Sequence, residues 1–355
     1  ANQQAAADRA QEKNELNAAS VDRVAGTLAD QFDPQYGGFG YAAADPNRPK
    51  FPEPSNLVFL SDRMNRDSVS QAERDRAKKM LLESLDGMIS GAMLDHLGGG
   101  FHRYSVDRRW QIPHFEKMLY DNGQLASVYS AAYRDTQRDE YRFVVEGICD
   151  FVLRELKAPG GGFYSALDAD SDGEEGKFYR WTDDELATLS KNISGFALAS
   201  EVFRLSSEPN FEGEYHVPDP GTTLTVLAEK RNQSFGELNA ELAPLRAAMF
   251  VARRQHARPI TDVKILTAWN GLMIGGLADA GRLLDRPDYT EAAAAAAEFV
   301  LSQLRQKDGR LLRSFAAGQA KLNAYVDDYA FLTSGLIALH RATQQTRWLD
   351  LALSL

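Results

Sequence analysis

The tripeptide Gly-Gly-Phe occurs three times in this 355-residue chain, and its phenylalanine falls at the equally spaced positions Phe39, Phe101 and Phe163. A degenerate fourth copy runs from Asp308 to Leu312. Repetition at a fixed spacing indicates one supersecondary unit that is used several times. We expect the glycines to supply the positive φ angles of a tight turn and the phenylalanine to plug a helical hairpin.

Helical periodicity predicts what lies between these turns. Apolar residues recur three or four positions apart, which is typical of a helix with one buried face. The clearest stripes are Val21/Val24/Ala25/Leu28, Met80/Leu81/Leu85/Met88, Leu125/Val128/Tyr129/Ala132 and Leu332/Gly335/Leu336/Leu339. Runs with period two are short, so we expect short hairpins in the loops and no large sheet.

Each turn is followed by a loop of 16–20 residues and then by a residue that favours a helix N-cap. These residues are Ser55, Asp121, Thr182 and, in the fourth copy, Asp327. Thr182 and Glu185 also have the spacing of a capping box. Each unit is therefore predicted to consist of a helix, a glycine turn, a loop and a second helix.

One unit of the repeat extends from Phe39 to Phe101, and the next extends from Phe101 to Phe163. These units are longer than tetratricopeptide, ankyrin or HEAT repeats, which span about 33–47 residues. They suit a ring of α-hairpins with long connecting loops. We expect one such domain over residues 21–355, incomplete at its C-terminal end, after a polar segment over residues 1–20. In a ring of this kind the inner helices begin at the end that carries the loops, so their first turns would face a central cavity.

Composition excludes several classes of function. Forty basic and fifty acidic residues give a net charge of −10, which disfavours nucleic-acid binding because that affinity comes from Lys and Arg contacts with phosphates. The single cysteine, Cys149, permits no internal disulfide and is expected to be a buried, unreactive thiol. No apolar run reaches the roughly 18 residues of a membrane helix, and residues 1–20 have no signal-peptide core, so a cytoplasmic location is expected.

Three of the six histidines, His96, His102 and His114, lie close together in the sequence. Histidine is suited to proton transfer near neutral pH, and a nearby carboxylate such as Glu116 can orient it. The same residues could be structural histidines or metal ligands, although their spacing matches no zinc signature. Acid–base chemistry or hydrogen bonding to a substrate is the interpretation we carry forward.

Five acidic residues fall within the eight positions 168–175 and amount to half of the net charge. Asp168, Asp170 and Asp172 match the first ligands of an EF-hand calcium loop, but Tyr179 stands where a bidentate Glu is needed. Carboxylates beside aromatic rings suit carbohydrate chemistry, in which one acid moves a proton and another activates water or stabilises positive charge. A calcium loop and a solvated acidic turn are the alternatives.

Two later segments are predicted to start further inner helices. Asn270 and the pair Asp327 and Asp328 suit N-caps, whose polar ends would point toward the mouth of the ring. Trp269 fits either the core or the lining of the cavity.

Four runs resemble a known family: GGGFHRYSVDRRWQIPHFEKMLYDN, GGFYSALDADSDGEEGKFYRW, KILTAWNGLMI and AYVDDYAFL. They are similar to the family of thioredoxin-domain proteins that includes spermatogenesis-associated protein 20 and bacterial YyaL, in order from about Tyr36 to Phe331. The resemblance implies an all-α (α/α)6 toroid of the six-hairpin glycosidase type, like that of N-acylglucosamine 2-epimerase and cellobiose epimerase. It transfers no established reaction.

The chain departs from this family in three ways. Members usually carry a thioredoxin-like domain before the toroid and continue beyond the position of Leu355, and many have a second polar residue where Val263 precedes Lys264. We therefore expect a fragment of a longer protein. A redox role does not carry over, and a thioredoxin-like domain is expected only as a partner.

These patterns together predict a carbohydrate-active protein that binds a sugar or sugar derivative in the cavity and epimerises, isomerises or hydrolyses it. The predicted acid–base residues are Asp168, Asp170, His114 and Glu116. The predicted substrate-binding residues are His102, Arg103, Trp110, Tyr120, Trp181, Trp269, Asn270, Asp327 and Asp328. No metal or other cofactor is expected, nor a nucleic-acid or membrane partner. The alternative is a non-catalytic scaffold that binds a ligand or partner beside a thioredoxin-like domain.

Overall fold

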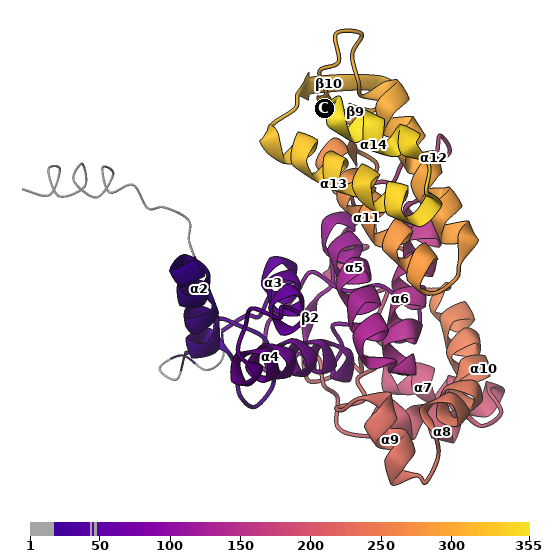
Figure 1. Cartoon of the computed structure of the whole chain (residues 1–355). Helices are drawn as coiled ribbons and strands as arrows, with labels where there is room; N and C mark the ends of the chain where they lie inside the picture. The colour runs from indigo at the N-terminus through magenta and orange to yellow at the C-terminus, as the bar shows by residue number, and fades with distance from the viewer. Residues whose placement is uncertain (1–17, 43–44, 46–47) are drawn as a thin grey trace, which may run out of the picture.

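The computed structural model describes residues 18–42, 45 and 48–355, and long helices alternate between an inner and an outer position along the chain (Figure 1). The inner helices are α3 (Pro54–Met64), α5 (Leu119–Thr136), α11 (Thr267–Leu283) and α13 (Val326–Thr343). The outer helices are α2 (Ala18–Gln31), α4 (Gln71–Ser90), α6 (Asp139–Phe151), α12 (Pro287–Gln303) and α14 (Thr346–Leu353). Each inner helix packs against the next, which gives the α/α toroid architecture that the repeat predicts.

Glycines allow the inner helices to approach closely. A Cβ atom on Gly271 of α11 would lie 2.5 Å from the backbone nitrogen of Leu332 in α13. One on Gly123 of α5 would lie 2.8 Å from the backbone nitrogen of Met273 in α11. Neither helix pair could keep its spacing with a larger residue there.

The Gly-Gly-Phe turns have the predicted role. Gly37, Gly99, Gly161 and Gly309 adopt positive φ angles of 65°, 74°, 105° and 88°. The apolar residue that follows each turn is almost fully buried in the core; these residues are Phe39, Phe101, Phe163 and Leu311.

The fourth residue of an inner helix holds the turn that precedes it. Asn122 of α5 accepts a hydrogen bond from the Phe101 backbone N–H (2.8 Å) and donates one to the Phe101 carbonyl (3.1 Å). Asn270 of α11 makes the same two bonds to Phe163, at 2.8 and 3.0 Å. In the fourth copy the backbone N–H of Leu311 donates a hydrogen bond to the Tyr329 hydroxyl (2.9 Å). The prediction that Asn270 is an N-cap is therefore wrong. Asn270 lies inside the first turn of α11 and acts as a clamp, since its two hydrogen bonds hold the preceding Gly-Gly-Phe turn.

The other predicted caps need a similar correction. Each of these helices begins two or three residues earlier than predicted, so the expected caps lie in the first turn; they are Ser55, Asp121, Asp327 and Asp328. Asp328 does take part in a capping box, but it occupies the N3 position of the helix and not the N-cap position.

Thr182 does form the predicted capping box with Glu185. The helix that it starts, α7 (Asp183–Asn192), opens an insertion and is not an inner helix. The insertion continues through α8 (Phe196–Val202), α9 (Leu224–Lys230) and α10 (Phe235–Arg253) and has its own apolar cluster. In Figure 1 it lies beside α6, and the inner helix of the third unit is α11, which begins only after the whole insertion.

The strands are short and lie in the loops that lead to inner helices. Two pairs are β1 (Tyr104–Ser105) with β2 (Pro113–His114), and β5 (Asp170–Ser171) with β6 (Glu174–Glu175). One antiparallel sheet has the order β3 (Lys117–Met118), β4 (Ala166–Leu167), β7 (Thr261–Asp262). Another has the order β8 (Ile265–Leu266), β9 (Leu312–Ala316), β10 (Gln319–Asn323).

A buried ion network recurs with the repeat and was not predicted. Four residues before Gly37, the carboxylate of Asp33 accepts from Lys50 (2.7 Å) and Arg108 (2.7 and 2.8 Å), and Lys50 also donates to the Gly37 carbonyl. The arrangement returns at the same position of the next unit. There Asp95 is bound by Lys117 (2.7 Å) and by Arg253 through two bonds of 2.8 Å, and Lys117 donates to the Gly99 carbonyl. In the third unit the equivalent position is Lys157, so the network is lost.

Three smaller expectations also have outcomes. Cys149 is fully buried, as predicted, and burial raises its pKa well above the ordinary value. Val21 and Val24 of α2 are about half exposed, so that stripe is not a buried face. Within the described ranges no helix has the length and apolarity needed to cross a membrane. Most of the polar segment over residues 1–20 lies outside the described residues.

Candidate functional site

Four of the predicted site residues meet where the loop after α4 enters α5. Arg103 Nη1 lies 2.7 Å from Glu116 Oε2, and His114 Nε2 lies 3.3 Å from the same oxygen. Tyr120, in the first turn of α5, contacts Arg103 through its hydroxyl. We call Arg103, His114, Glu116, Tyr120 and Asp121 the mouth cluster, because they lie at the end where the inner helices begin.

His114 is held between two carboxylates. Its Nδ1 lies 2.7 Å from Glu175 Oε1 in β6, opposite the contact with Glu116. Its ring stacks on Tyr104 with centroids 4.8 Å apart, since the register of β1 and β2 pairs the two residues. Both ring nitrogens of His114 therefore face carboxylates from different loops, and the side chain is one-quarter exposed.

Asp168 directly follows β4, and Asp170 is the first residue of β5. The residue before Asp168, Leu167, pairs with Lys117, which follows Glu116 in the sequence. Asp170 pairs with Glu175, the second partner of His114. Both aspartates are exposed.

The rest of the acidic loop is neutralised locally. Lys177 lies 2.9 Å from Asp172 and 2.7 Å from Glu174, and Arg180 also binds Glu174. Among the described residues of this loop, Asp168, Asp170 and Glu175 are left without an ion pair to a Lys or Arg side chain, and Glu175 contacts His114.

Asp121 is the site residue that sequence reasoning missed. It is 5% exposed, and one of its oxygens, Oδ2, has no hydrogen-bond partner among the described residues. Burial raises the pKa of Asp121 to about 7, against the opposing attraction of Arg103. Its position in a first turn was visible in the sequence and suggested a cap, whereas its burial was not.

The mouth cluster also has an unsatisfied donor and an aromatic wall. Nε of Arg103 is buried and has no partner in the described part of the chain. The ring of Tyr120 lies 4.8 Å from that of Trp269, the third residue of α11. Together these groups offer a buried carboxyl, a guanidinium donor, an oriented imidazole and two adjacent rings, which is the set that binds and protonates a hydroxylated ligand.

Several predicted binding residues are instead held by the protein. Nδ1 of His102 contacts the Phe115 carbonyl at 2.9 Å, and burial lowers the pKa of His102 to about 3. Trp110 is buried, and its Nε1 donates to the Tyr36 carbonyl. Trp181 packs on a histidine of the loop after α10.

The carboxylates at the start of α13 are also occupied. Asp328 accepts from the backbone N–H groups of Ala268 (3.0 Å) and Tyr325 (2.9 Å) and lies 3.0 Å from Arg313. Arg313 also lies 3.4 Å from Asp327. The structure therefore brings Arg103, His114, Glu116 and Tyr120 together, with Trp269, Asp168 and Asp170 alongside, and assigns the others internal partners.

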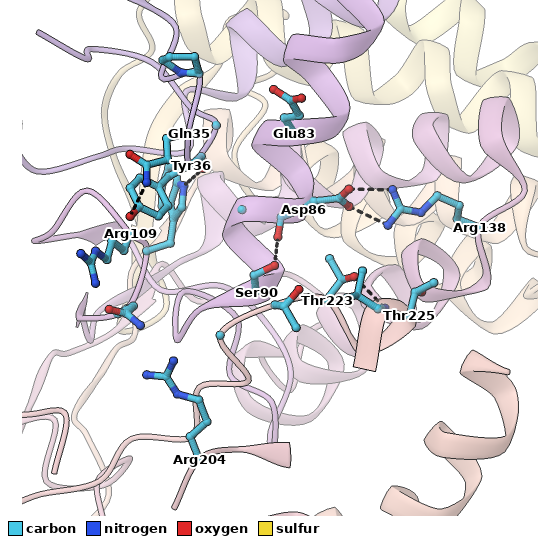
Figure 2. Close-up of a pocket in the computed structure, with 18 residues that line it drawn as sticks. Gln35, Tyr36, Glu83, Asp86, Ser90, Arg109, Arg138, Arg204, Thr223 and Thr225 are labelled. Carbon is cyan, nitrogen blue, oxygen red and sulfur yellow. Dashed lines mark hydrogen bonds and ion pairs between the residues drawn. The ribbon is translucent and has the colours of Figure 1, made fainter. Parts of the chain in front are cut away.

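A large cavity lies away from the mouth cluster. Its volume is about 680 Å³, and its wall includes Tyr36, Arg109 and Arg204 (Figure 2). At that wall Asp86 forms an ion pair of 2.8 Å with Arg138. Trp110 is the one predicted site residue that lines it.

Among the described residues no three His, Cys, Asp or Glu side chains are grouped as a metal site would require. The first EF-hand positions, Asp168, Asp170 and Asp172, therefore do not converge.

Known proteins resemble this chain in sequence and in fold. No family model matches it. It is 36% identical over 369 aligned residues to spermatogenesis-associated protein 20 of Mus musculus, covering 92% of this chain and 45% of that protein. It is 33% identical to an uncharacterized protein of Caenorhabditis elegans, covering 91% and 48%. The chain thus spans about half the length of the curated relatives it matches.

Among solved structures, the GH76 α-mannanase of Bacteroides thetaiotaomicron superposes with a TM-score of 0.54 at 11% identity, covering 96% of this chain and 70% of that one. At that identity the likeness concerns the fold alone. The chain is therefore an α/α toroid of the architecture found in that mannanase, and over nine tenths of its length it is similar in sequence to spermatogenesis-associated protein 20.

Proposed function

We propose that the mouth cluster binds a sugar or sugar derivative and epimerises, isomerises or hydrolyses it by acid–base catalysis. The observation that carries the proposal is the unpartnered oxygen of Asp121, buried beside Arg103 and Tyr120. A buried polar atom without a partner is unfavourable, and a ligand hydroxyl would satisfy it.

Each group has a distinct role in this proposal. Asp121, with a pKa of about 7, gives or takes the proton at the reacting carbon or oxygen. His114 is the second proton-transfer group and is oriented by Glu116 and Glu175. Arg103 donates to a ligand oxygen. Trp269 and the adjacent, tilted ring of Tyr120 form the apolar wall on which a sugar ring lies.

Asp168 and Asp170 supply further carboxylates at the rim of the same site. The fold of the GH76 α-mannanase is consistent with a carbohydrate ligand, and the name of that enzyme makes mannosides a first substrate class to test. The thioredoxin-like partner and the cytoplasmic location stay predictions.

The test is turnover by the purified chain. Mannose, glucose and N-acetylglucosamine are incubated in D2O, and NMR follows deuterium exchange and new isomers, while reducing-sugar release from α-mannosides reports hydrolysis. We expect turnover in one arm and a loss of about 10²–10⁴-fold in Asp121→Asn, the usual contribution of a general acid or base. Asp184→Asn, an exposed first-turn aspartate of α7, is the matched control and should keep full activity.

Calorimetry on the same sugars separates the alternatives. Saturable binding without turnover would support the non-catalytic scaffold instead. Neither binding nor turnover, or full activity in Asp121→Asn, would refute the proposal.

A further inference from the structure

A second cavity, of about 180 Å³, lies between the insertion and the ring. Its wall combines the loop over residues 94–99, one side of α6, Arg154 and Arg246 of α10. It shares no lining residue with the mouth cluster, so the role of this cavity does not depend on the proposed function.

Arg246 is the unusual residue in this wall. It is 7% exposed, and its guanidinium lies over the ring of Phe143 with the carbon 4.6 Å from the centroid. Nη2 donates to the side chain and the carbonyl of Asn239. Nη1 is buried and has no hydrogen-bond partner in the described part of the chain.

No carboxylate of the described chain forms an ion pair with Arg246. The other buried arginines, Arg63, Arg180 and Arg253, each form an ion pair with at least one carboxylate. Burial alone lowers the pKa of Arg246, to about 10, and it stays charged at neutral pH. A buried charge without a counterion is strongly unfavourable, so proteins normally supply a partner.

The two acidic residues of the cavity wall have partners of their own. Asp95 is already bound by Lys117 and Arg253, and Asp150 accepts from a tyrosine hydroxyl and lies 3.7 Å from Arg286, a cation that two further acids share. His96 contacts a backbone carbonyl, and burial lowers its pKa to about 4, so it is neutral at physiological pH.

Arg154 adds a second guanidinium to the wall. It is paired with Glu155 at 2.8 Å and also donates to the Gly98 carbonyl. Glu155 is shared with Arg258 as well, so this acid is already matched by two cations. Arg246 is therefore the guanidinium of this wall that has no carboxylate partner among the described residues.

We propose that this cavity is a binding site for a small oxyanion, a phosphate or the phosphoryl end of a phosphorylated metabolite, with Arg246 as its main ligand. Nη1 of Arg246 carries two N–H donors without a partner, and charge-assisted hydrogen bonds from a guanidinium to phosphoryl oxygens are among the strong ones in proteins. At about 180 Å³ the cavity is smaller than the roughly 300–1,000 Å³ of ordinary small-molecule pockets, which favours a charged end group over a whole sugar.

The experiment measures unfolding of the full chain in a low-salt buffer, with and without inorganic phosphate, and binding by calorimetry. We expect phosphate at 100 times its dissociation constant to lower the unfolding constant of the wild type about 100-fold, because only the folded protein binds it. Arg246→Met keeps the packing on Phe143 but should lose this response.

Two further variants make the result specific. Arg347→Met removes an exposed arginine at the other end of the chain and should respond to phosphate like the wild type. Arg246→Lys keeps the positive charge but lacks the planar guanidinium, so it should bind phosphate measurably but more weakly than the wild type. This variant keeps the proposal testable if Arg246→Met fails to fold.

A comparison of ligands identifies the source of the anion. Glucose 6-phosphate binding more tightly than inorganic phosphate would support a phosphorylated metabolite, and the reverse order would support the free ion. The proposal fails if neither anion binds the wild type, or if both bind Arg246→Met or Arg246→Lys as tightly as they bind the wild type.

Discussion

Asp95 and Asp121 are both buried aspartates, and their surroundings act on their protonation in opposite ways. Burial works to raise the pKa of Asp95, but Arg253 and Lys117 hold it well below its ordinary value. Around Asp121 burial prevails, because the charge of Arg103 and a hydrogen bond with Tyr120 offset it only in part and Glu116 adds negative charge. The balance between burial and nearby positive charge therefore sets the direction in which the pKa of each aspartate shifts.

This difference predicts how Asp121 affects stability. Burial favours the neutral acid in the folded state, so the unfolded chain, with a carboxyl pKa near 3.8, releases the proton first. The free energy of unfolding should therefore fall as pH rises from about 4 to about 7 and then level off. The rise of the pKa from 3.8 to about 7 corresponds to roughly 4 kcal/mol.

Asp121→Asn should remove this fall in the free energy of unfolding with rising pH. We expect the variant to match the wild type near pH 4 and to exceed it above pH 7 by up to about 4 kcal/mol, measured by urea unfolding across this range. The control Asp184→Asn should show no such pH-dependent gap. An Asp121→Asn variant with a constant offset at every pH would show that Asp121 is not protonated in the folded protein.

At the scale of single elements, the joint between each glycine turn and its inner helix depends on one side chain. In the third unit, the amide of Asn270 satisfies both the N–H and the carbonyl of Phe163 and also donates to the Leu266 carbonyl. All of these groups are buried or partly buried, so water cannot replace the lost partner at no cost.

Asn270→Ala should destabilise the fold by about 2–4 kcal/mol, since each buried group left without a partner costs roughly 1–3 kcal/mol. Chemical denaturation measures the change, and Asn65→Ala, which removes an exposed asparagine at the end of α3, should cost under about 0.5 kcal/mol. If Asn270→Ala is as stable as the wild type but loses ligand binding, Asn270 is a ligand residue and not a clamp.

The sequence was informative about elements that repeat and silent about those that do not. The equal spacing of Gly-Gly-Phe and the helical stripes were enough to predict the hairpins, their turns and the inner helices at Asn270 and Asp327. The insertion was missed because Thr182 caps a helix at nearly the same distance from Phe163 as in the other units. Local capping chemistry does not reveal where in the fold a helix packs.

The same limit applies to the site. Arg103, His114, Glu116 and Tyr120 were predictable because one short loop carries them all. Asp121 needed knowledge of burial, and buried partners of Trp110 and Asp328 come from other segments of the chain. The Asp–Lys–Arg networks were missed for that reason, since Arg253 lies 158 residues from Asp95.

At the scale of the whole molecule, a few buried contacts join the insertion to the ring. Arg253 of α10 binds Asp95 through two hydrogen bonds. Glu140 of α6 accepts from the backbone N–H groups of Leu224 and Thr225 at the start of α9. The first contact fixes the insertion to the loop that leads into the mouth cluster, and the second fixes it to α6.

Arg253→Met should loosen this joint. Removing one partner of a buried ion pair costs about 3–5 kcal/mol, because the other charge stays buried. We expect faster hydrogen exchange and proteolysis across residues 182–253, with α11 and α13 less affected, whereas Arg254→Met, an exposed neighbour, should behave like the wild type. Uniform loosening of the whole chain would show instead that the insertion and the ring unfold as one unit.

The insertion also affects how the protein is assembled during synthesis. Phe163 leaves the ribosome 107 residues ahead of Asn270, the residue that clamps its turn. At about 5–20 residues per second, roughly 5–20 s of translation separate the two. For that time the side of α5 that receives α11 has no partner. We expect this window to be when the nascent chain most needs a chaperone.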